Sequence, residues 1–374
     1  MSAQEASASE EAPRTDAGTP PPRASLREDL GSEIPDAAAA SQIYNRGYYG
    51  EPQPGGGLRL DPRETAYLLE MGRLRVEESG SPLSFAALLA RAHHRGEAFE
   101  ILYLVYRDLR QRGYVVRPGP PPFPFALLPR GGSPQKNPPR FWVEAFSERT
   151  PFSLTSLETL LAACRGARRS LLLGVVDEES DLTFYRVREV RPQGLHAPRE
   201  LPTPGTGWFF GDRVSIFPEP AVGLLGTGEG YGSPVGERLE LSLLEAWELC
   251  EGSRLVLKRP SGDDLSKEEF QAAALVIEPD LPLRLPVYRD LRRAGLLPKT
   301  GFKYGAHFRA YEKDPSSSHA RYLVHVVPPG WKAPWPELAR AIRLAQGVRK
   351  QFLLSTVHDE ASPPVYYHLE RTRP

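Results

Sequence analysis

The stretch GVRKQFLLSTVHDE (347–360) decides the fold, because it repeats an earlier stretch of the same chain, GARRSLLLGVVDEE (166–179). The two stretches lie 181 residues apart. A spacing of 182 residues superposes LVYRDLRQRG (104–113) on PVYRDLRRAG (286–295). Matches at one nearly constant spacing indicate that the chain contains the same fold twice.

The two copies differ at three polar side chains. At the 181-residue spacing, the second copy replaces Arg130 with Tyr311, Pro138 with His319 and Arg169 with Lys350. Since the apolar framework matches elsewhere, this difference suggests that the first copy is a scaffold and that the second carries out the chemistry.

The composition fits a protein of two ordinary domains. The 374 residues include 47 Lys+Arg and 47 Asp+Glu, so the formal net charge is zero and no global basic field indicates nucleic-acid binding. Any RNA-binding surface must therefore be local. Only eight of the cations are lysines, which makes a lysine at a motif position, such as Lys350, more informative than usual.

Cysteine content and hydropathy indicate the compartment. Cys164 and Cys250 are too few for a zinc cluster or a disulfide framework. No apolar run approaches the roughly 18 to 20 residues of a membrane span, and the N-terminus lacks the apolar stretch of a secretory signal. The sequence therefore predicts a soluble, cytoplasmic protein that does not contact a membrane.

We predict an α/β (α+β) fold of two tandem repeats. Residues 1–24 are rich in Ser, Ala, Glu and Pro, which predicts a disordered tail. The noncatalytic repeat follows at 25–196, and a linker rich in Pro and Gly spans 197–205. The catalytic repeat occupies 206–374, with a nuclease-like subdomain at about 300–374.

Each repeat is expected to open with a small helical or mixed subdomain. Asp61-Pro62 precedes the helical stretch RETAYLLEMG, and Ser242 stands three residues before Glu245, which is a capping-box spacing. A second helix follows in each copy. It is interrupted near Arg95-Gly96 in the first copy and near Pro279 in the second.

The downstream half of each repeat shows a different pattern. AHFRAYEK (306–313) and ARYLVHVV (320–327) alternate like paired strands, the apolar spacing of 334–350 is helical, and QFLLSTV (351–357) is typical of a buried strand. VYYHLER (365–371) closes the sheet. The first copy shows the same order, which predicts a nuclease-like subdomain with a mixed central sheet flanked by helices.

The three polar side chains fall where one sheet edge could bring them together. Tyr311 ends one predicted strand, His319 opens the next, and Lys350 stands where the helix gives way to a buried strand. A Tyr, a His and a Lys without clustered carboxylates indicate metal-free chemistry on a phosphodiester, with the RNA 2′-hydroxyl as nucleophile. We therefore expect no metal ion and no cofactor.

Each of the three residues then has its own role. Tyr311 takes the proton from the 2′-oxygen. Because a tyrosine hydroxyl ordinarily ionises only at about pH 10, a nearby cation such as Lys350 must help. His319 protonates the departing 5′-oxygen near neutral pH, and Lys350 offsets negative charge on the nonbridging oxygens. The products would be a 2′,3′-cyclic phosphate and a 5′-hydroxyl.

The remaining histidines receive no role in the chemistry. His307, His325 and His368 alternate within predicted strands, so we expect structural positions for them. His93 and His94 lie beside a helix break, which indicates a surface position.

The chain resembles the archaeal tRNA-splicing endonuclease, in the form with two fused repeats per chain. The resemblance rests on KYGAHFRAY (303–311), SHARYLVHVV (318–327) and RAIRLAQGVRKQFLLSTV (340–357), and it extends through GDRVSIF (211–217). It implies an intron-excising endoribonuclease of the lyase type that recognises the bulge-helix-bulge of precursor tRNA and assembles as a homodimer.

The resemblance also implies roles for individual residues. The catalytic Tyr, His and Lys of the family match the three residues described above. Its two arginines that sandwich a bulged base match Arg343 and Arg371, with Arg373 as a competing choice for the second. Guanidinium stacking on an unpaired base reads a bulge without reading its sequence.

In this family an acidic loop of the noncatalytic repeat docks into a basic cleft of the catalytic repeat on the other protomer. DEESD (177–181) fits this description. It contributes four carboxylates: Asp177, Glu178, Glu179 and Asp181.

Two other classes of function stay open. A metal-dependent nuclease of the restriction-enzyme type would share the subdomain, but it needs an acidic pair and a Glu-x-Lys-like strand to hold Mg²⁺. Residues 300–374 contain no such set. A noncatalytic RNA-binding or assembly subunit would predict that His319→Ala leaves the function unchanged.

Overall fold

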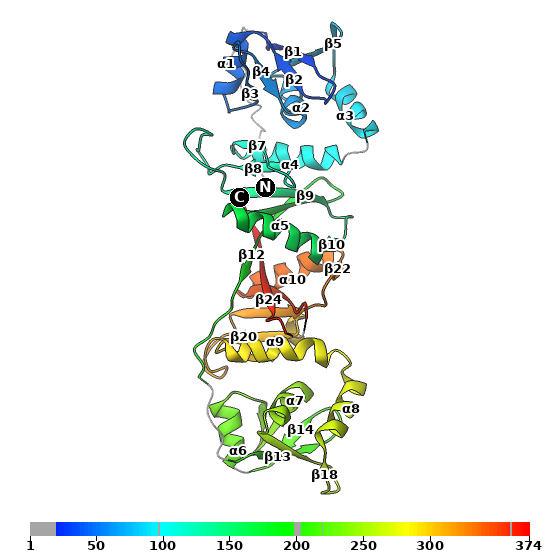
Figure 1. Ribbon diagram of the computed structural model, residues 1–374, viewed down its shortest axis with the longest axis vertical. Coiled ribbons are helices and arrows are strands. Elements are labelled where there is room, and N and C mark those ends of the chain that lie inside the picture. The colour runs from blue at the N-terminus through cyan, green and yellow to red at the C-terminus, as the bar shows by residue number, and fades with distance from the viewer. Residues whose placement is uncertain (1–19, 96–97, 198–202, 219, 360) are drawn as a thin grey trace, which may run out of the picture. The chain divides into compact units, whose positions relative to one another are not determined.

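The computed structural model describes most of the chain (Figure 1), namely residues 20–95, 98–197, 203–218, 220–359 and 361–374. These residues form two compact units. The first unit holds the described residues up to Pro118 together with Leu128–Pro138, and the second holds Gly119–Leu127 and Pro139–Pro374.

The predicted tail and linker lie partly outside the described residues. Residues 1–19 lie outside the described residues, as do residues 198–202 of the predicted linker. Strand β1 (Arg23–Leu26), however, begins inside the segment 1–24 and pairs in parallel with β5 (Arg75–Glu78). Backbone hydrogen bonding therefore orders the last residues of the predicted tail.

The first unit contains a six-stranded mixed sheet with the strand order β3-β4-β2-β1-β5-β6. Besides β1 and β5, its strands are β2 (Ser32–Ile34), β3 (Glu51–Pro52), β4 (Leu58–Leu60) and β6 (Ser81–Pro82). The helices are α1 (Ala37–Asn45), α2 (Pro62–Glu70), α3 (Phe85–His94) and α4 (Phe99–Gln111), and strand β7 (Val116–Pro118) follows them.

The second copy opens with a matching sheet of the order β15-β16-β14-β13-β17-β18. Its strands are β13 (Gly205–Phe209), β14 (Val214–Ile216), β15 (Ser233–Val235), β16 (Arg238–Leu241), β17 (Leu255–Lys258) and β18 (Asp264–Leu265). The helical segments are α6 (Pro220–Gly223), a π-helical turn (Leu224–Gly228), α7 (Leu243–Glu251), α8 (Lys267–Ile277) and α9 (Leu281–Arg293).

The predicted helices of these subdomains are confirmed, together with their starts. In α7 the Ser242 hydroxyl accepts a hydrogen bond from the Glu245 backbone N at 3.2 Å, and the Glu245 carboxylate accepts one from the Ser242 backbone N at 3.0 Å. Asp61 and Glu64 form the same capping box at α2. The individual strands of the two six-stranded sheets were not predicted. With the helices they make both subdomains mixed, which is one of the two forms that the sequence left open.

The second unit is organised around one long sheet that includes, in order, β19-β20-β21-β23-β24-β12-β11-β9-β8. The first copy supplies β8 (Phe125–Leu127), β9 (Phe141–Ser147), β11 (Ser170–Val176) and β12 (Leu182–Val190). The second copy supplies β19 (Leu297–Thr300), β20 (Phe308–Tyr311), β21 (Tyr322–Val326), β23 (Gln351–Thr356) and β24 (Val365–Thr372).

Helix α5 (Leu154–Ala167) precedes β11, helix α10 (Trp335–Gly347) precedes β23, and a 3₁₀ turn (Phe302–Tyr304) precedes β20. A short ribbon of β10 (Phe152–Ser153) and β22 (Lys332–Ala333) also links the copies. The pairing in the second copy is antiparallel, parallel and antiparallel along β20, β21, β23 and β24. The predicted order of elements is therefore confirmed.

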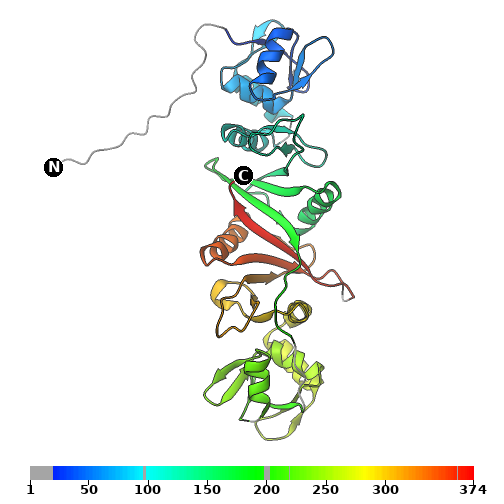
Figure 2. The same ribbon diagram turned by 90° about the vertical axis from the view of Figure 1, so that its left-hand side faces the viewer.

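An antiparallel ladder between β12 and β24 joins the two copies, from Phe184↔Thr372 to Val190↔Tyr366. Figure 2 shows these two long strands side by side, in green and red. The first copy's nuclease-like subdomain therefore shares a sheet with the second copy. For this reason the compact units divide the chain within the first repeat and not between the repeats.

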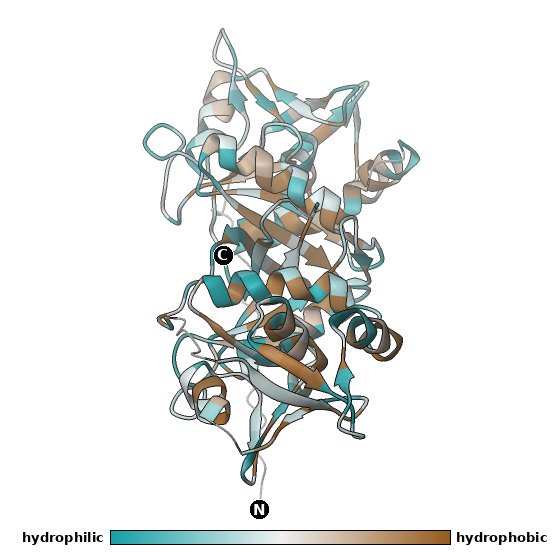
Figure 3. Cartoon of the chain, turned by 60° about the horizontal axis from the view of Figure 1, so that its bottom comes forward, coloured by the Kyte–Doolittle hydropathy of each residue, from teal (hydrophilic) through white to brown (hydrophobic). Residues whose placement is uncertain are grey.

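Side chains from both copies fill one core beneath this ladder. Leu160 and Leu173 of the first copy belong to the same buried cluster as Leu338 and Phe352 of the second. The rings of Tyr185 and Trp335 stack with their centroids 5.8 Å apart. In Figure 3 the hydrophobic colour concentrates on the central strands of this sheet. The predicted mixed α/β fold of two repeats is confirmed.

Candidate active site

The strand ends next to Tyr311, His319 and Lys350 lie side by side at one edge of the long sheet. In the ladder Ala310 pairs with Tyr322, and Tyr322 pairs with Gln351. The Arg321 backbone N donates to the Ala310 carbonyl at 3.0 Å, and the Gln351 backbone N donates to the Arg321 carbonyl at 2.9 Å. Neighbouring strands lie about 4.8 Å apart, so the three backbones fall within about 10 Å.

Tyr311 and Lys350 belong to the same face of this sheet. Arg309, Leu323 and Phe352 form one row across the three strands. Because side chains alternate along a strand, Tyr311 shares the face of Arg309 and Lys350 shares the face of Phe352.

The end of helix α10 brings Lys350 to this edge. Arg349 has a left-handed backbone (φ 55°), and the Lys350 backbone N donates to the Ala345 carbonyl at 2.8 Å. The turn therefore reverses the chain from helix to strand within a few residues. The Lys350 ammonium then lies 5.5 Å from the ring centre of Tyr304, which is a cation–π contact.

His319 is exposed at the end of the loop between β20 and β21. An ion pair between Glu312 and Arg321 closes the base of this loop at 2.5 Å. Ala320, the next residue after His319, is buried in a small cluster with Tyr311. His319 therefore directly precedes the residue that packs with Tyr311. Its imidazole is exposed and accessible to a ligand.

Arg343 and Arg371 both lie near Tyr185. Arg371 pairs with Tyr185 in the β12–β24 ladder, and the Gln346 side chain donates to the Arg371 carbonyl at 2.9 Å. Burial raises the pKa of Tyr185, and the two guanidinium groups oppose that rise. The positive charges of both arginines therefore act on the same residue of the sheet, Tyr185.

The same sheet edge continues from Lys350 to Arg371. Phe352 pairs with Leu369 in the β23–β24 ladder, so two residues further along Lys350 stands opposite Arg371. Arg373, the competing choice, follows the end of β24. Neighbouring strands β20, β21, β23, β24 and β12 thus connect Tyr311 at one side of this edge with Tyr185 at the other.

The acidic residues 177–181 form an exposed hairpin loop between β11 and β12. The Asp177 carboxylate accepts backbone hydrogen bonds from Glu179 at 3.0 Å and from Asp181 at 2.8 Å. Asp177 and Asp181 also line a cavity of about 320 Å³ with Arg340 and Arg343 of the same chain.

The ladder gives an independent alignment of the two copies. Phe141 of the first copy pairs with Ser170, as Tyr322 of the second pairs with Gln351. This register confirms Pro138 and Arg169 as the counterparts of His319 and Lys350.

The register corrects the counterpart of the tyrosine. Leu127 pairs with Phe141, as Ala310 pairs with Tyr322. Leu128 therefore stands in the place of Tyr311, and the expected match with Arg130 is wrong. Leu127 and its partner Phe141 are 14 positions apart, whereas Ala310 and Tyr322 are 12 positions apart, so the connection is two residues longer in the first copy and the 181-residue spacing does not hold before it.

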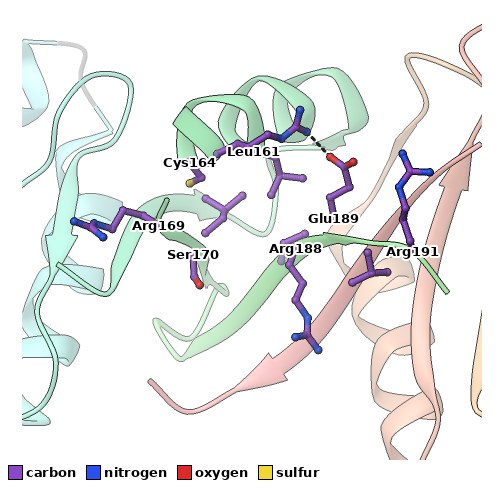
Figure 4. Close-up of a pocket in the computed structure, with 11 residues that line it drawn as sticks. Leu161, Cys164, Arg169, Ser170, Arg188, Glu189 and Arg191 are labelled. Carbon is purple, nitrogen blue, oxygen red and sulfur yellow. Dashed lines mark hydrogen bonds and ion pairs between the residues drawn. The ribbon is translucent and has the colours of Figure 1, made fainter. Parts of the chain in front are cut away.

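The equivalent sheet edge of the first copy does not carry a matching group of Tyr, His and Lys. Arg169 lines a cavity of about 360 Å³ together with Arg188 and Arg191. Figure 4 shows these three side chains pointing away from one another. The Arg188 Nε donates instead to His368 Nδ1 at 3.2 Å. The first copy therefore has positively charged side chains at this edge, but they do not point toward one shared site.

The strand histidines have structural contacts, as the sequence predicts. The rings of His307 and His325 stack 4.6 Å apart, and His307 Nδ1 accepts a hydrogen bond from the Val326 backbone N at 2.9 Å. Burial, and then the neighbouring His325, lower the pKa of His307 to about 4. His307 is therefore neutral in the folded protein near neutral pH.

Within the described ranges, no group of three or more His, Cys, Asp or Glu side chains could hold a metal ion. In the same part of the chain, no helix has the length and apolarity that crossing a membrane requires.

Two protein-family models match both copies of the chain. The model described as tRNA intron endonuclease, catalytic C-terminal domain, matches residues 99–184 and 281–367. The model described as tRNA intron endonuclease, N-terminal domain, matches residues 28–89 and 205–271. The chain belongs to the tRNA intron endonuclease family.

Relatives with the name tRNA-splicing endonuclease match along most of their length. The protein from Methanococcoides burtonii is 38% identical over 327 residues, which cover 86% of this chain and 92% of the relative. The protein from Methanosarcina mazei is 37% identical over 331 residues, with 86% and 92% covered. The protein from Halobacterium salinarum is 32% identical over 344 residues, with 86% and 91% covered.

Proposed function

We propose that this protein is a metal-independent endoribonuclease that excises introns from precursor tRNA at bulge-helix-bulge sites. Its family supports the general reaction, an endonuclease that acts on tRNA introns. One observation supports the finer proposal. Tyr311 ends β20, His319 lies just before β21 and Lys350 just before β23, and these three strand ends are neighbours in one ladder.

The proposed reaction uses the RNA 2′-hydroxyl as the nucleophile. Tyr311 Oη accepts the 2′ proton as the 2′-oxygen attacks the phosphorus. The bond from phosphorus to the 5′-oxygen breaks, and His319 donates a proton to that oxygen. Lys350 offsets the charge that builds on the nonbridging oxygens. The fragments then end in a 2′,3′-cyclic phosphate and a 5′-hydroxyl.

Arg343 and Arg371 are proposed to hold an unpaired base of the bulge between their guanidinium planes. Both lie near Tyr185, and the row of strand ends leads from Lys350 to Arg371. A base held there would be adjacent to the reacting phosphate. Stacking of this kind tolerates any base, so it would recognise the bulge and not its sequence.

We further propose a homodimer in which the loop 177–181 docks on the catalytic copy of the partner. The loop is exposed, and it carries four carboxylates. Glu178 and Glu179 do not line the cavity that Asp177 and Asp181 share with Arg340. Glu178 Oε2 also lies 3.4 Å from Arg149 Nη2 in an exposed ion pair, so a basic surface of a second copy would compete with Arg149 for Glu178 and would meet Glu179 as well.

The deciding experiment is cleavage of a bulge-helix-bulge RNA in EDTA, followed by analysis of the fragment ends. The proposal expects full cleavage, 2′,3′-cyclic phosphates and 5′-hydroxyls. Cleavage that needs Mg²⁺ and leaves 5′-phosphates would indicate a metal-dependent nuclease instead. Tight RNA binding without cleavage under any condition would indicate a noncatalytic RNA-binding subunit.

A further inference from the structure

A cavity of about 980 Å³ opens beside Tyr311 in the second unit. Its walls come from segments that are distant in the chain: residues 195–197, residues 226–234, strands β19 and β20, and the loop 312–316. The volume lies at the upper end of the roughly 300–1,000 Å³ that ligand sites usually enclose.

Most charged side chains around this cavity are satisfied by neighbours. Two of them form ion pairs, Lys299 with Glu245 at 3.4 Å and Glu312 with Arg321 at 2.5 Å. The His196 imidazole makes a hydrogen bond with the Glu229 carboxylate at 3.4 Å. The Asp314 carboxylate accepts two hydrogen bonds from Ser316, both at 2.8 Å. These groups therefore stabilise the walls of the cavity.

Arg309 differs from these residues. It lies two residues before Tyr311 on β20, on the same face of the strand, and its guanidinium carbon is 5.7 Å from the Tyr311 ring centre. Its Nε is buried, and among the described residues it has no hydrogen-bond partner. A buried donor without a partner is costly, and more so when it carries charge. Arg309 is also among the residues that line the cavity, so its guanidinium presents positive charge to an anionic ligand there.

The first copy has no equivalent of this guanidinium. Ala126 pairs with Trp142 in the β8–β9 ladder, as Arg309 pairs with Leu323. Ala126 therefore takes the place of Arg309. The arginine thus follows the same asymmetry between the copies as Tyr311, His319 and Lys350.

We propose that Arg309 binds a phosphate of single-stranded RNA in this cavity, next to the phosphate that is cleaved. This inference rests on the proposed function, because it takes Tyr311 as a residue of the reaction site. Arginine presents a planar fork of donors that matches phosphate oxygens in pairs. Binding at Arg309 would fix the strand at one side of the cleaved bond.

The test compares the variants Arg309→Ala and Arg309→Lys with the control Arg75→Ala, which removes an exposed arginine of the first unit. The ligand is a bulge-helix-bulge RNA with 2′-deoxyribose at the cleavage position, so that binding is measured without cleavage. Affinity is measured at several salt concentrations. Cleavage of the all-ribose RNA is measured in parallel.

Arg309→Ala is expected to weaken binding about tenfold and to reduce the slope of log affinity against log salt by about 0.7, the value for one single-strand phosphate. Arg309→Lys should keep the slope and lose about threefold in affinity, because lysine cannot donate in pairs. Arg75→Ala should change neither quantity.

The inference is overturned if Arg309→Ala slows cleavage while affinity and salt slope stay at the wild-type values, since Arg309 would then only position Tyr311. Should Arg309→Ala fail to fold, Arg309→Lys decides, and wild-type affinity in that variant overturns the inference. A wild-type protein that binds but does not cut the all-ribose RNA contradicts the proposed function alone, because the salt slopes still test Arg309.

Discussion

Backbone hydrogen bonds align the strand ends next to the proposed catalytic residues. The two bonds that align this edge join Arg321 to Ala310 and Gln351 to Arg321. Neither uses the side chain of His319 or Lys350. These side chains can therefore be replaced with little effect on the fold, which makes the proposed chemistry testable by substitution.

His319→Ala is expected to lower the cleavage rate by about 10²–10⁴-fold, the usual contribution of a general acid. RNA affinity and melting temperature should stay unchanged, because the imidazole is exposed. Single-turnover cleavage and a binding titration measure the two effects, with His93→Ala as the control for an exposed histidine. Cleavage at the wild-type rate would refute the role of His319.

Arg371→Ala is expected to weaken binding of bulged RNA about tenfold, since base stacking contributes about 1–3 kcal/mol per base. Arg373→Ala should have little effect, because Arg373 follows the end of β24 while Arg371 pairs with Tyr185. A binding titration on both variants compares two arginines of the same strand end. The opposite ranking would assign the second stacking position to Arg373.

His307 makes stability depend on pH. Its folded pKa of about 4 lies below the ordinary 6.5, since burial and His325 disfavour the charged ring. Between these values the unfolded chain binds a proton that the folded chain does not, so stability is complete above about pH 6.5 and falls toward pH 4. The melting temperature should fall less steeply in His307→Gln, whereas the exposed control His94→Gln should match the wild type.

The secondary-structure elements differ in how much of them the sequence revealed. β23 and α10 were predicted because each is long enough to show its period, six residues for the strand and thirteen for the helix. The sheets of the opening subdomains were missed because several of their strands have only two to four residues, such as β3 and β5. So short a stretch cannot show alternation.

The candidate site divides in the same way. Tyr311, His319 and Lys350 were predicted because the two copies differ at these positions and because each lies beside a recognisable strand. The counterpart of Tyr311 was misassigned because a connection of different length shifts the register by two residues. Arg309 was not predicted, since the cavity beside it forms only when residues 226–234 and residues 195–197 meet strand β20.

Helix α7 provides a test of element stability. Ser242→Ala removes the hydroxyl that accepts from the Glu245 backbone N, and it should lower the free energy of unfolding by about 1 kcal/mol. Ser261→Ala is the matched control, because that exposed hydroxyl only donates to Asp263 within a turn. Denaturant unfolding measures both variants, and equal losses would contradict the capping argument.

At the scale of the whole molecule, the first copy supplies strand β12, which pairs with β24 of the second copy, and side chains of both copies fill one shared core. The loop 177–181 connects β11 to β12, the strand that pairs with β24. A partner that docks on this loop would therefore act on the same sheet that carries the proposed site.

The double variant Glu178→Gln/Glu179→Gln is expected to shift the protein from dimer to monomer and to reduce cleavage in parallel. Asp177 is left in place because its carboxylate holds the turn. Light scattering coupled to gel filtration measures the mass. A control with Glu237→Gln/Glu268→Gln removes two exposed carboxylates elsewhere. A dimer of unchanged stability would exclude docking through these two glutamates.

The ladder between β12 and β24 also makes each copy's nuclease-like subdomain depend on the other copy for its stability. A gene cut between the copies would yield two fragments, each with a long unpaired border of N–H and C=O groups and half of an apolar core open to water. Such borders recruit any strand they meet. Two separately expressed halves would therefore be expected to aggregate unless they found each other through these two strands.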